Sequence, residues 1–187
     1  MDRIITLLVP FLLAAVAVNP LMAGVPGEGQ KAPDFALTSL RGKTVRLSEV
    51  LAKGPIVLVV LRGYPGYQCP ICNRQVQEFL SSAQGFSELG VRVVMVYPGP
   101  PEGLGTKAQE FTADKKFPDN FELLLDPGYE FTRLYGLRWD APGETAYPST
   151  FLIDQRGVVF FAKVSKSHGD RTRAVDIIEI LKKKAVR

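Results

Sequence analysis

The sequence has few of the residues that bind metals or cross-link small domains, because its 187 residues include two cysteines, one histidine and one tryptophan. Two cysteines and one histidine cannot supply the ligand set of a structural zinc ion. A disulfide between Cys69 and Cys72 would close so short a loop that it would hardly constrain the unfolded chain. The scarcity therefore disfavours a structural role for the cysteines and favours a redox-active pair.

An excess of charge of one sign is also lacking, since 23 Lys and Arg stand against 19 Asp and Glu, which leaves a net charge of +4. The cationic residues are scattered, apart from Lys182–Lys184 near the C-terminus, and the chain contains no internal repeat. We therefore expect no nucleic-acid partner. With 46% hydrophobic residues, the chain is suited to one domain with a sizeable core.

The longest hydrophobic run is the N-terminal stretch Ile4–Val18, which is shorter than the roughly 20 residues of a membrane-spanning helix. A charged start precedes it and Ala23 follows it, which is the pattern of a signal peptide. We predict a signal peptide at 1–23, a linker at 24–30 and a single domain at 31–187. The mature protein would be periplasmic or extracellular, unless an uncleaved leader retains it at the membrane.

The two cysteines lie between a predicted strand and a predicted helix. Ile56–Leu61 is an unbroken aliphatic run, typical of a strand that is buried on both faces. Downstream, the apolar residues fall on one stripe of a helix, namely Cys72, Val76, Phe79, Leu80 and Ala83. Pro70 suits the first helical position, so Cys69 is predicted to cap the helix.

This position predicts different roles for the two thiols. Because unpaired N–H groups and the helix dipole favour a thiolate, Cys69 is predicted to face solvent and to act as the nucleophile. Cys72, on the apolar stripe, is predicted to be shielded and to resolve a mixed disulfide. The dipole alone lowers a pKa by less than about one unit. Arg62 and Arg74 are the nearby candidates for a further cation, and the sequence leaves their roles open.

The rest of the chain predicts alternating strands and helices. Further strands are predicted at 35–39 and 44–47, which form an N-terminal hairpin, at 91–97, at 122–126, and in a later hairpin of 146–154 and 158–164. Helices are predicted at 48–52 with Ser48 as cap, at 104–116, at 129–135, and after a cap at Asp170. This alternation predicts an α/β sandwich with a central mixed sheet.

Three segments resemble the redoxins, the thioredoxin-fold group that includes the alkyl hydroperoxide reductase/thiol-specific antioxidant (AhpC/TSA) family and the exported thiol-disulfide oxidoreductases. They are Lys31–Phe35, Val57–Cys72 with its Cys-Pro-Ile-Cys motif, and Pro148–Asp154. The resemblance extends over about residues 27–184. It implies a thioredoxin-like α/β/α sandwich with an N-terminal β-hairpin extension.

The resemblance also implies a docking element beside the cysteines. In thioredoxin-like proteins the proline before the later strand is cis and faces the cysteine pair, which would place Pro148 beside Cys69. Tyr147 and Arg62 would then support substrate docking. Peroxidases of the group carry a threonine or serine three residues before the first cysteine and a proline seven before it, where this chain has Gly66 and Arg62. The tryptophan usual in thiol-disulfide enzymes is Gln68 here.

These departures favour a thiol-based oxidoreductase without a cofactor that performs thiol-disulfide exchange on exported proteins. The alternative is a peroxiredoxin-like peroxidase that reduces hydrogen peroxide or alkyl hydroperoxides through a sulfenic acid at Cys69. Either enzyme would need an external thiol reductant, such as a thioredoxin-like protein or a membrane electron donor.

A non-enzymatic alternative is a copper-binding redoxin with Cys69, Cys72 and His168 as ligands. The spacing of the cysteines and the place of the histidine differ from those of copper carriers of this fold, so we predict no metal site. His168 is predicted to be solvated in the polar loop 165–169. Trp139 is predicted either to rim the active site or to pack as a half-buried aromatic. Tyr64 and Tyr67 are predicted to contact the substrate or to shield the sulfur.

Overall fold

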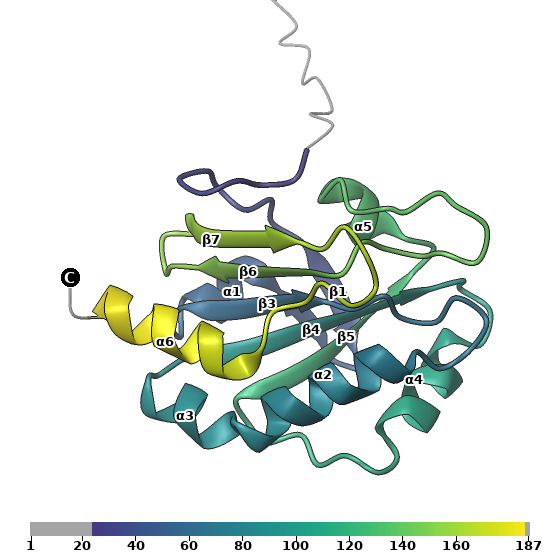
Figure 1. The fold of residues 1–187 in the computed structure, drawn as a ribbon, viewed down its shortest axis with the longest axis horizontal. Coiled ribbons are helices and arrows are strands. Elements are labelled where there is room, and N and C mark those ends of the chain that lie inside the picture. The colour runs from purple at the N-terminus through teal and green to yellow at the C-terminus, as the bar shows by residue number, and fades with distance from the viewer. Residues whose placement is uncertain (1–23, 186–187) are drawn as a thin grey trace, which may run out of the picture.

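Seven strands form the centre of the molecule, with helices on both faces of the sheet (Figure 1). The computed structural model describes residues 24–185. The predicted signal peptide at 1–23 lies outside the described residues, and its cleavage remains a prediction. Within 24–185, no helix is long and apolar enough to cross a membrane.

The strands and helices alternate along most of the chain. The strands are β1 (Ala36–Ser39), β2 (Thr44–Arg46), β3 (Ile56–Val60), β4 (Arg92–Gly99), β5 (Phe121–Pro127), β6 (Ser149–Ile153) and β7 (Val159–Val164). The helices are α1 (Leu47–Leu51), α2 (Pro70–Ser81), α3 (Ala83–Glu88), α4 (Leu104–Thr112), α5 (Glu130–Leu134) and α6 (Ala174–Ala185).

The sheet is mixed, as the sequence predicts, with the strand order β2-β1-β5-β4-β3-β6-β7. The neighbours β3, β4 and β5 are parallel, whereas β1 and β6 join this group antiparallel. The N-terminal hairpin of β1 and β2 is confirmed, and it extends the sheet beyond β5. Every residue of β3 is buried, which explains its unbroken aliphatic sequence.

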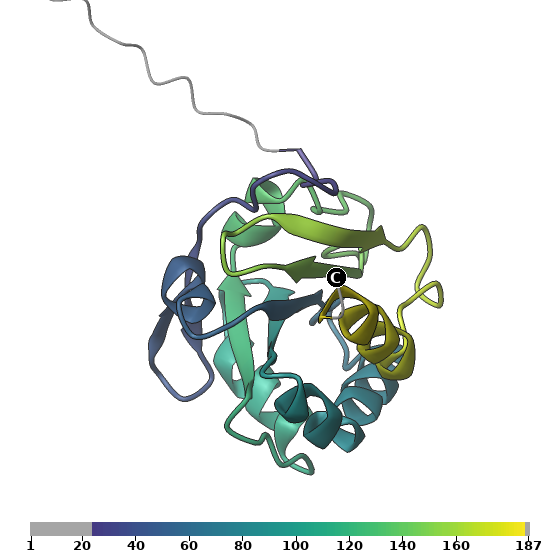
Figure 2. The same cartoon turned by 90° about the vertical axis from the view of Figure 1, so that its left-hand side faces the viewer.

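Two apolar layers enclose the sheet, and the view of Figure 2 shows helices on either side of it. Val57, Val59 and Leu61 point into one layer, together with buried side chains of α2, α3, α4 and α6. Ile56, Leu58 and Val60 point into the other layer, with α1 and α5. The alternation along β3 therefore anchors both layers, and the cysteine helix α2 packs on the face shared with α6.

Two predicted helix caps are wrong. Helix α1 begins at Leu47, and the hydroxyl of Ser48 donates to Asp34 instead of capping. Helix α6 begins only at Ala174, because the carboxylate of Asp170 pairs with the Lys163 ammonium at 2.5 Å. Residues 165–173 consequently form a loop, which brings its side chains to the cysteine pair.

The segment at 24–30, predicted as a linker, runs beside the start of β7. The Gly29 N–H donates to the Val159 carbonyl at 2.8 Å, and the Val159 N–H donates to the Gln30 carbonyl at 2.9 Å. These hydrogen bonds cover the first residue of an edge strand.

Gly63, three residues after the end of β3, lies where no side chain fits. Its φ is +71°, and a Cβ there would overlap the carbonyl oxygen of Pro98. We expect Gly63→Ala to lower the free energy of unfolding by at least about 2 kcal/mol, measured by chemical denaturation. Gly105→Ala in α4 is the control, because a Cβ there meets nothing within 4 Å and should be neutral or stabilising. Equal stabilities of the two variants would contradict this expectation.

Candidate active site

Strand β3 delivers the cysteines through the loop 61–68. Cys69 is the N-cap of α2 and Pro70 is its first residue, as predicted, and the Cys72 N–H donates to the Cys69 Sγ at 3.3 Å. The expectation that Cys69 faces solvent is wrong, since Cys69 is only 3% exposed, against 0% for Cys72. The apolar layer of β3, α2 and α4 encloses both sulfurs.

Cys69 lines a pocket of about 380 Å³ between the start of α2 and the end of α4. Gln68, Pro70 and Asn73 form one wall, and residues 110–111 and 113–115 form the other. Gln68 is fixed by two hydrogen bonds, because it accepts from the Tyr97 hydroxyl at 2.7 Å and donates to the Lys107 carbonyl at 2.8 Å. The pocket is a concave approach to the Cys69 sulfur with room for a small molecule or an inserted side chain.

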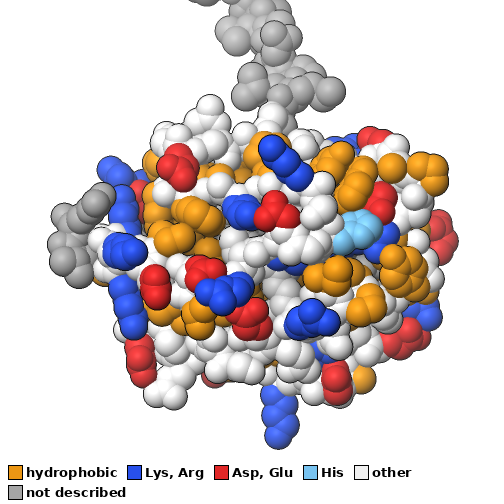
Figure 3. Space-filling view, viewed as in Figure 1, with side chains coloured by type: hydrophobic (Ala, Val, Ile, Leu, Met, Phe, Trp, Pro, Cys, Tyr) orange, Lys and Arg blue, Asp and Glu red, His pale blue; other side chains and the backbone are white. Residues whose placement is uncertain are grey.

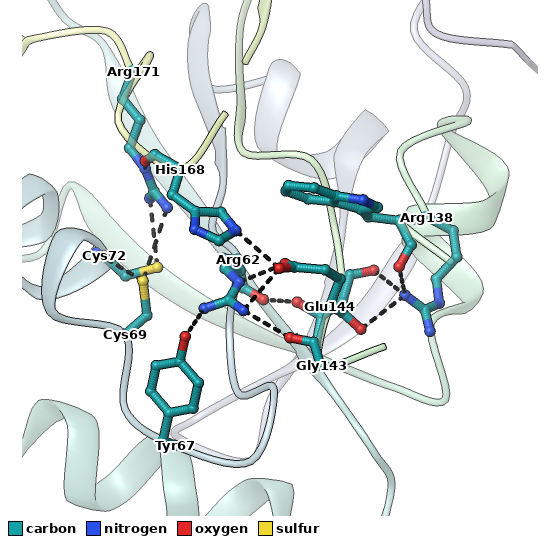
Figure 4. A network of polar contacts seen from close by, with 11 residues as sticks. Arg62, Tyr67, Cys69, Cys72, Arg138, Gly143, Glu144, His168 and Arg171 are labelled. Carbon is teal, nitrogen blue, oxygen red and sulfur yellow. Dashed lines mark hydrogen bonds and ion pairs between the residues drawn. The ribbon is translucent and has the colours of Figure 1, made fainter. Parts of the chain in front are cut away.

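The cation beside the sulfurs is Arg171, from the loop before α6 (Figure 4). Its Nη1 lies 3.5 Å from the Cys72 Sγ, and its Nη2 lies 3.9 Å from the Cys69 Sγ. Its Nε donates to the His168 carbonyl at 2.7 Å, and its Nη1 also donates to Gln75 Oε1 at 2.9 Å. Neither Arg62 nor Arg74, the two candidates from the sequence, is the cation in direct contact with the sulfurs. Arg74 is exposed on α2.

These contacts move the pKa values of the two thiols in opposite directions. The hydrogen bond from the Cys72 thiol lowers the pKa of Cys69 to about 5, and burial opposes this shift. The Cys72 backbone N–H and the charges of Arg171 and Arg62 lower it further. Burial raises the pKa of Cys72, and the hydrogen bond to Cys69 raises it further against the attraction of Arg171. These directions favour a thiolate at Cys69 over one at Cys72, and the roles of nucleophile and resolving thiol stay predictions.

Arg62 is buried, 4% exposed, in a separate polar cluster. Its Nε donates to Glu144 Oε2 at 2.6 Å, and its Nη2 donates to Glu144 Oε1 at 3.1 Å and to the Gly143 carbonyl at 2.7 Å. Its Nη1 donates to the Tyr67 hydroxyl. A bidentate carboxylate thus neutralises this guanidinium. Arg62 connects the cysteine loop to the segment 143–145 and acts on Cys69 only through its more distant charge.

His168 belongs to the same cluster as Arg62. Its Nε2 lies 3.0 Å from Glu144 Oε1, so the imidazole is directed at a carboxylate and at neither sulfur. This geometry does not favour the copper-binding alternative. Trp139 stacks on Tyr147, with ring centroids 4.7 Å apart, and also contacts the imidazole. Figure 3 shows the histidine at the surface among hydrophobic side chains.

The predicted docking element is wrong in one respect. None of the peptide bonds in 24–185 is cis, so the bond before Pro148 is trans. Pro148 is buried, and its carbonyl accepts from the Ser165 N–H at 2.8 Å, which continues the pairing of β6 with β7. Arg171 occupies the place beside the sulfurs. The ring of Tyr147 stacks on Trp139, and a docking role for Tyr147 stays a prediction.

The family model that matches the chain is described as AhpC/TSA family, and it covers residues 28–162. The chain belongs to the AhpC/TSA family. Its match to the chloroplastic peroxiredoxin Q of Populus jackii is 31% identical over 141 residues, which is 75% of this chain. The chain spans 61% of the length of that relative.

Two further proteins are matched over a larger share of their own length. The thiol-disulfide oxidoreductase ResA of Halalkalibacterium halodurans is 26% identical over 157 residues, 84% of this chain and 78% of ResA. The solved structure of the peroxidoxin BcpB from Mycobacterium tuberculosis matches with a TM-score of 0.67 at 25% identity. That match covers 87% of this chain and 99% of BcpB. The thioredoxin-like fold of this AhpC/TSA chain is thereby confirmed.

Proposed function

We propose that the protein is an oxidoreductase that exchanges disulfides with exported proteins through Cys69 and Cys72. The observation that supports this most is the placement of both sulfurs, one helical turn apart, under a single guanidinium. Cys72 already donates its backbone N–H to the sulfur that it would attack. The second step therefore needs no unfolding of α2. Export of the substrates rests on the predicted signal peptide.

The cycle transfers two electrons from the cysteine pair to the substrate. The Cys69 thiolate attacks one sulfur of a substrate disulfide, so that the S–S bond breaks, a mixed disulfide forms and a substrate thiolate leaves. Cys72 then gives its proton to the departing thiolate or to solvent and attacks the Cys69 Sγ. The substrate leaves as a dithiol, and the pair becomes a disulfide. An external thiol reductant returns the pair to the reduced state.

Two features of the loop before Cys69 disfavour fast peroxide reduction. Peroxide reduction needs donors that hold both peroxide oxygens while the O–O bond breaks. Gly66 offers no side-chain donor, and Glu144, Gly143 and Tyr67 occupy the guanidinium of Arg62. The similarity to ResA, which is named a thiol-disulfide oxidoreductase, supports exchange as well.

The second candidate function is peroxide reduction, and the low exposure of Cys69 favours it. The sulfur of a cysteine that is 3% exposed, at the wall of a pocket, is easier to reach for a small peroxide than for a protein disulfide. In this reaction the thiolate attacks one peroxide oxygen, water or an alcohol leaves, and Cys69 becomes a sulfenic acid. Cys72 then condenses with it and releases water. Relatives named peroxiredoxin support this candidate.

Stopped-flow oxidation of the reduced protein separates the two functions. We expect the second-order rate constant for a model protein disulfide to exceed that for hydrogen peroxide by about tenfold or more, because disulfide exchange does not need the donors that peroxide reduction needs. Cys69→Ser is the control and should react with neither oxidant. A peroxide rate constant well above the disulfide rate constant would assign the protein to the peroxidases.

A further inference from the structure

Gln75 is a polar side chain buried in the apolar layer beneath the cysteines. It lies on α2 three residues after Cys72 and is 6% exposed. Both ends of its amide are used, since Nε2 donates to the Thr172 carbonyl at 3.3 Å and Oε1 accepts from Arg171 Nη1 at 2.9 Å. A buried polar group is costly unless it is hydrogen-bonded, and here both bonds go to the loop 165–173.

The surroundings of Arg171 are neutral, unlike those of Arg62. Its guanidinium donates to the His168 carbonyl and to the Gln75 amide oxygen, which carry no net charge. No ion pair within residues 24–185 includes Arg171. Its positive charge is therefore left for the two sulfurs, whereas Glu144 compensates the charge of Arg62.

We propose that Gln75 is a positioning residue that holds Arg171 over Cys69 and Cys72 without neutralising its charge. A glutamate at the same position would hold the guanidinium equally well but would compensate its charge. A leucine would leave the charge of Arg171 uncompensated but would remove the hydrogen bond that positions its guanidinium. Only the amide provides both a fixed guanidinium and an uncompensated cation. This proposal rests on the proposed function in one respect, that the Cys69 thiolate is the nucleophile.

The test measures the pKa of the Cys69 thiol from the pH dependence of its alkylation, with mass spectrometry to identify the modified residue. We expect Gln75→Glu to raise this pKa by about one to two units, as a nearby carboxylate does. Because the wild-type pKa is about 5, alkylation at about pH 6 should fall by about two- to tenfold, since the thiolate fraction drops from about nine-tenths to between about a half and a tenth. The control is Gln77→Glu, the same change on the exposed face of α2, which should leave the profile unchanged.

A second variant keeps the proposal testable if Gln75→Glu does not fold. Gln75→Leu removes the hydrogen bond to Arg171 without adding a charge. It should raise the Cys69 pKa in the wild-type chain, but it should have no such effect in a chain that already carries Arg171→Met. Equal effects in both chains would show a structural role only and would overturn the proposal. Identical profiles for Gln75→Glu and Gln77→Glu would overturn it as well. An ordinary Cys69 pKa in the wild-type protein would instead count against the proposed function.

Discussion

Replacing Cys72 with serine is expected to stop the catalytic cycle at a mixed disulfide between Cys69 and the substrate. The first attack needs only the Cys69 thiolate, whose pKa is lowered, but the second needs a thiol one helical turn away. Multiple-turnover activity should fall by about a hundredfold or more. Non-reducing electrophoresis and peptide mass spectrometry would detect the trapped adduct and its site of attachment.

The matched control for this experiment is Cys69→Ser. Cys72 is fully buried, and burial raises the pKa of its thiol, so this variant should trap no adduct. An adduct through Cys72 in Cys69→Ser, with none through Cys69 in Cys72→Ser, would reverse the roles of nucleophile and resolving thiol. It would also show that the helix cap does not decide which sulfur reacts.

The local parts of this site could be predicted from the sequence. The run Ile56–Leu61 predicts a doubly buried strand, and Pro70 fixes the start of the next helix, so the cap position of Cys69 follows from neighbouring residues alone. The burial of Cys72 follows from the apolar stripe in the same way. These predictions succeed because the interactions that decide them lie within one or two turns of chain.

The cation over the sulfurs could not be predicted in this way, because Arg171 lies 102 residues from Cys69 in the sequence. The Asp170 carboxylate is a typical helix cap, but it pairs with Lys163 across the chain reversal after β7. The predicted helix start is therefore three residues too early. A signal was present in Gln75, a polar residue next to the apolar stripe, which indicates a polar partner in the facing segment.

Two other errors have the same origin in tertiary packing. Cys69 is buried because the loop 61–68 and α4 close around it, and no pattern near the cysteine records this. The cis bond before Pro148 was implied by the resemblance to thioredoxin-like proteins. In this chain that bond is trans, and Arg171 lies 3.9 Å from the Cys69 Sγ, so the family resemblance predicts the fold better than it predicts the details beside the sulfurs.

Replacing Arg171 with methionine should shift the pH profile of Cys69 rather than abolish its reactivity. The charge of Arg171 helps to lower the Cys69 pKa, so removing the charge should raise the pKa and move the acid limb of the rate profile to higher pH. At about pH 4, below the wild-type pKa of about 5, the rate with a small disulfide should fall about tenfold for each unit by which the pKa rises, because the thiolate fraction falls by that factor. Alkylation or disulfide exchange measured across the pH range provides the profile.

At alkaline pH the same variant is expected to react faster than the wild-type protein. A thiolate of higher pKa is intrinsically more nucleophilic, with a Brønsted coefficient of about 0.4–0.5, which amounts to about threefold per pKa unit once both thiols are ionised. The two profiles should therefore cross. Arg62→Met is the contrasting variant, because it removes the guanidinium from the partly buried Glu144 carboxylate and should lower the free energy of unfolding by about 1–3 kcal/mol with a smaller shift of the profile. If the rate of Arg171→Met were instead lower than that of the wild type by the same factor at every pH, the variant would have a packing defect. Arg171 would then have no part in setting the pKa of Cys69.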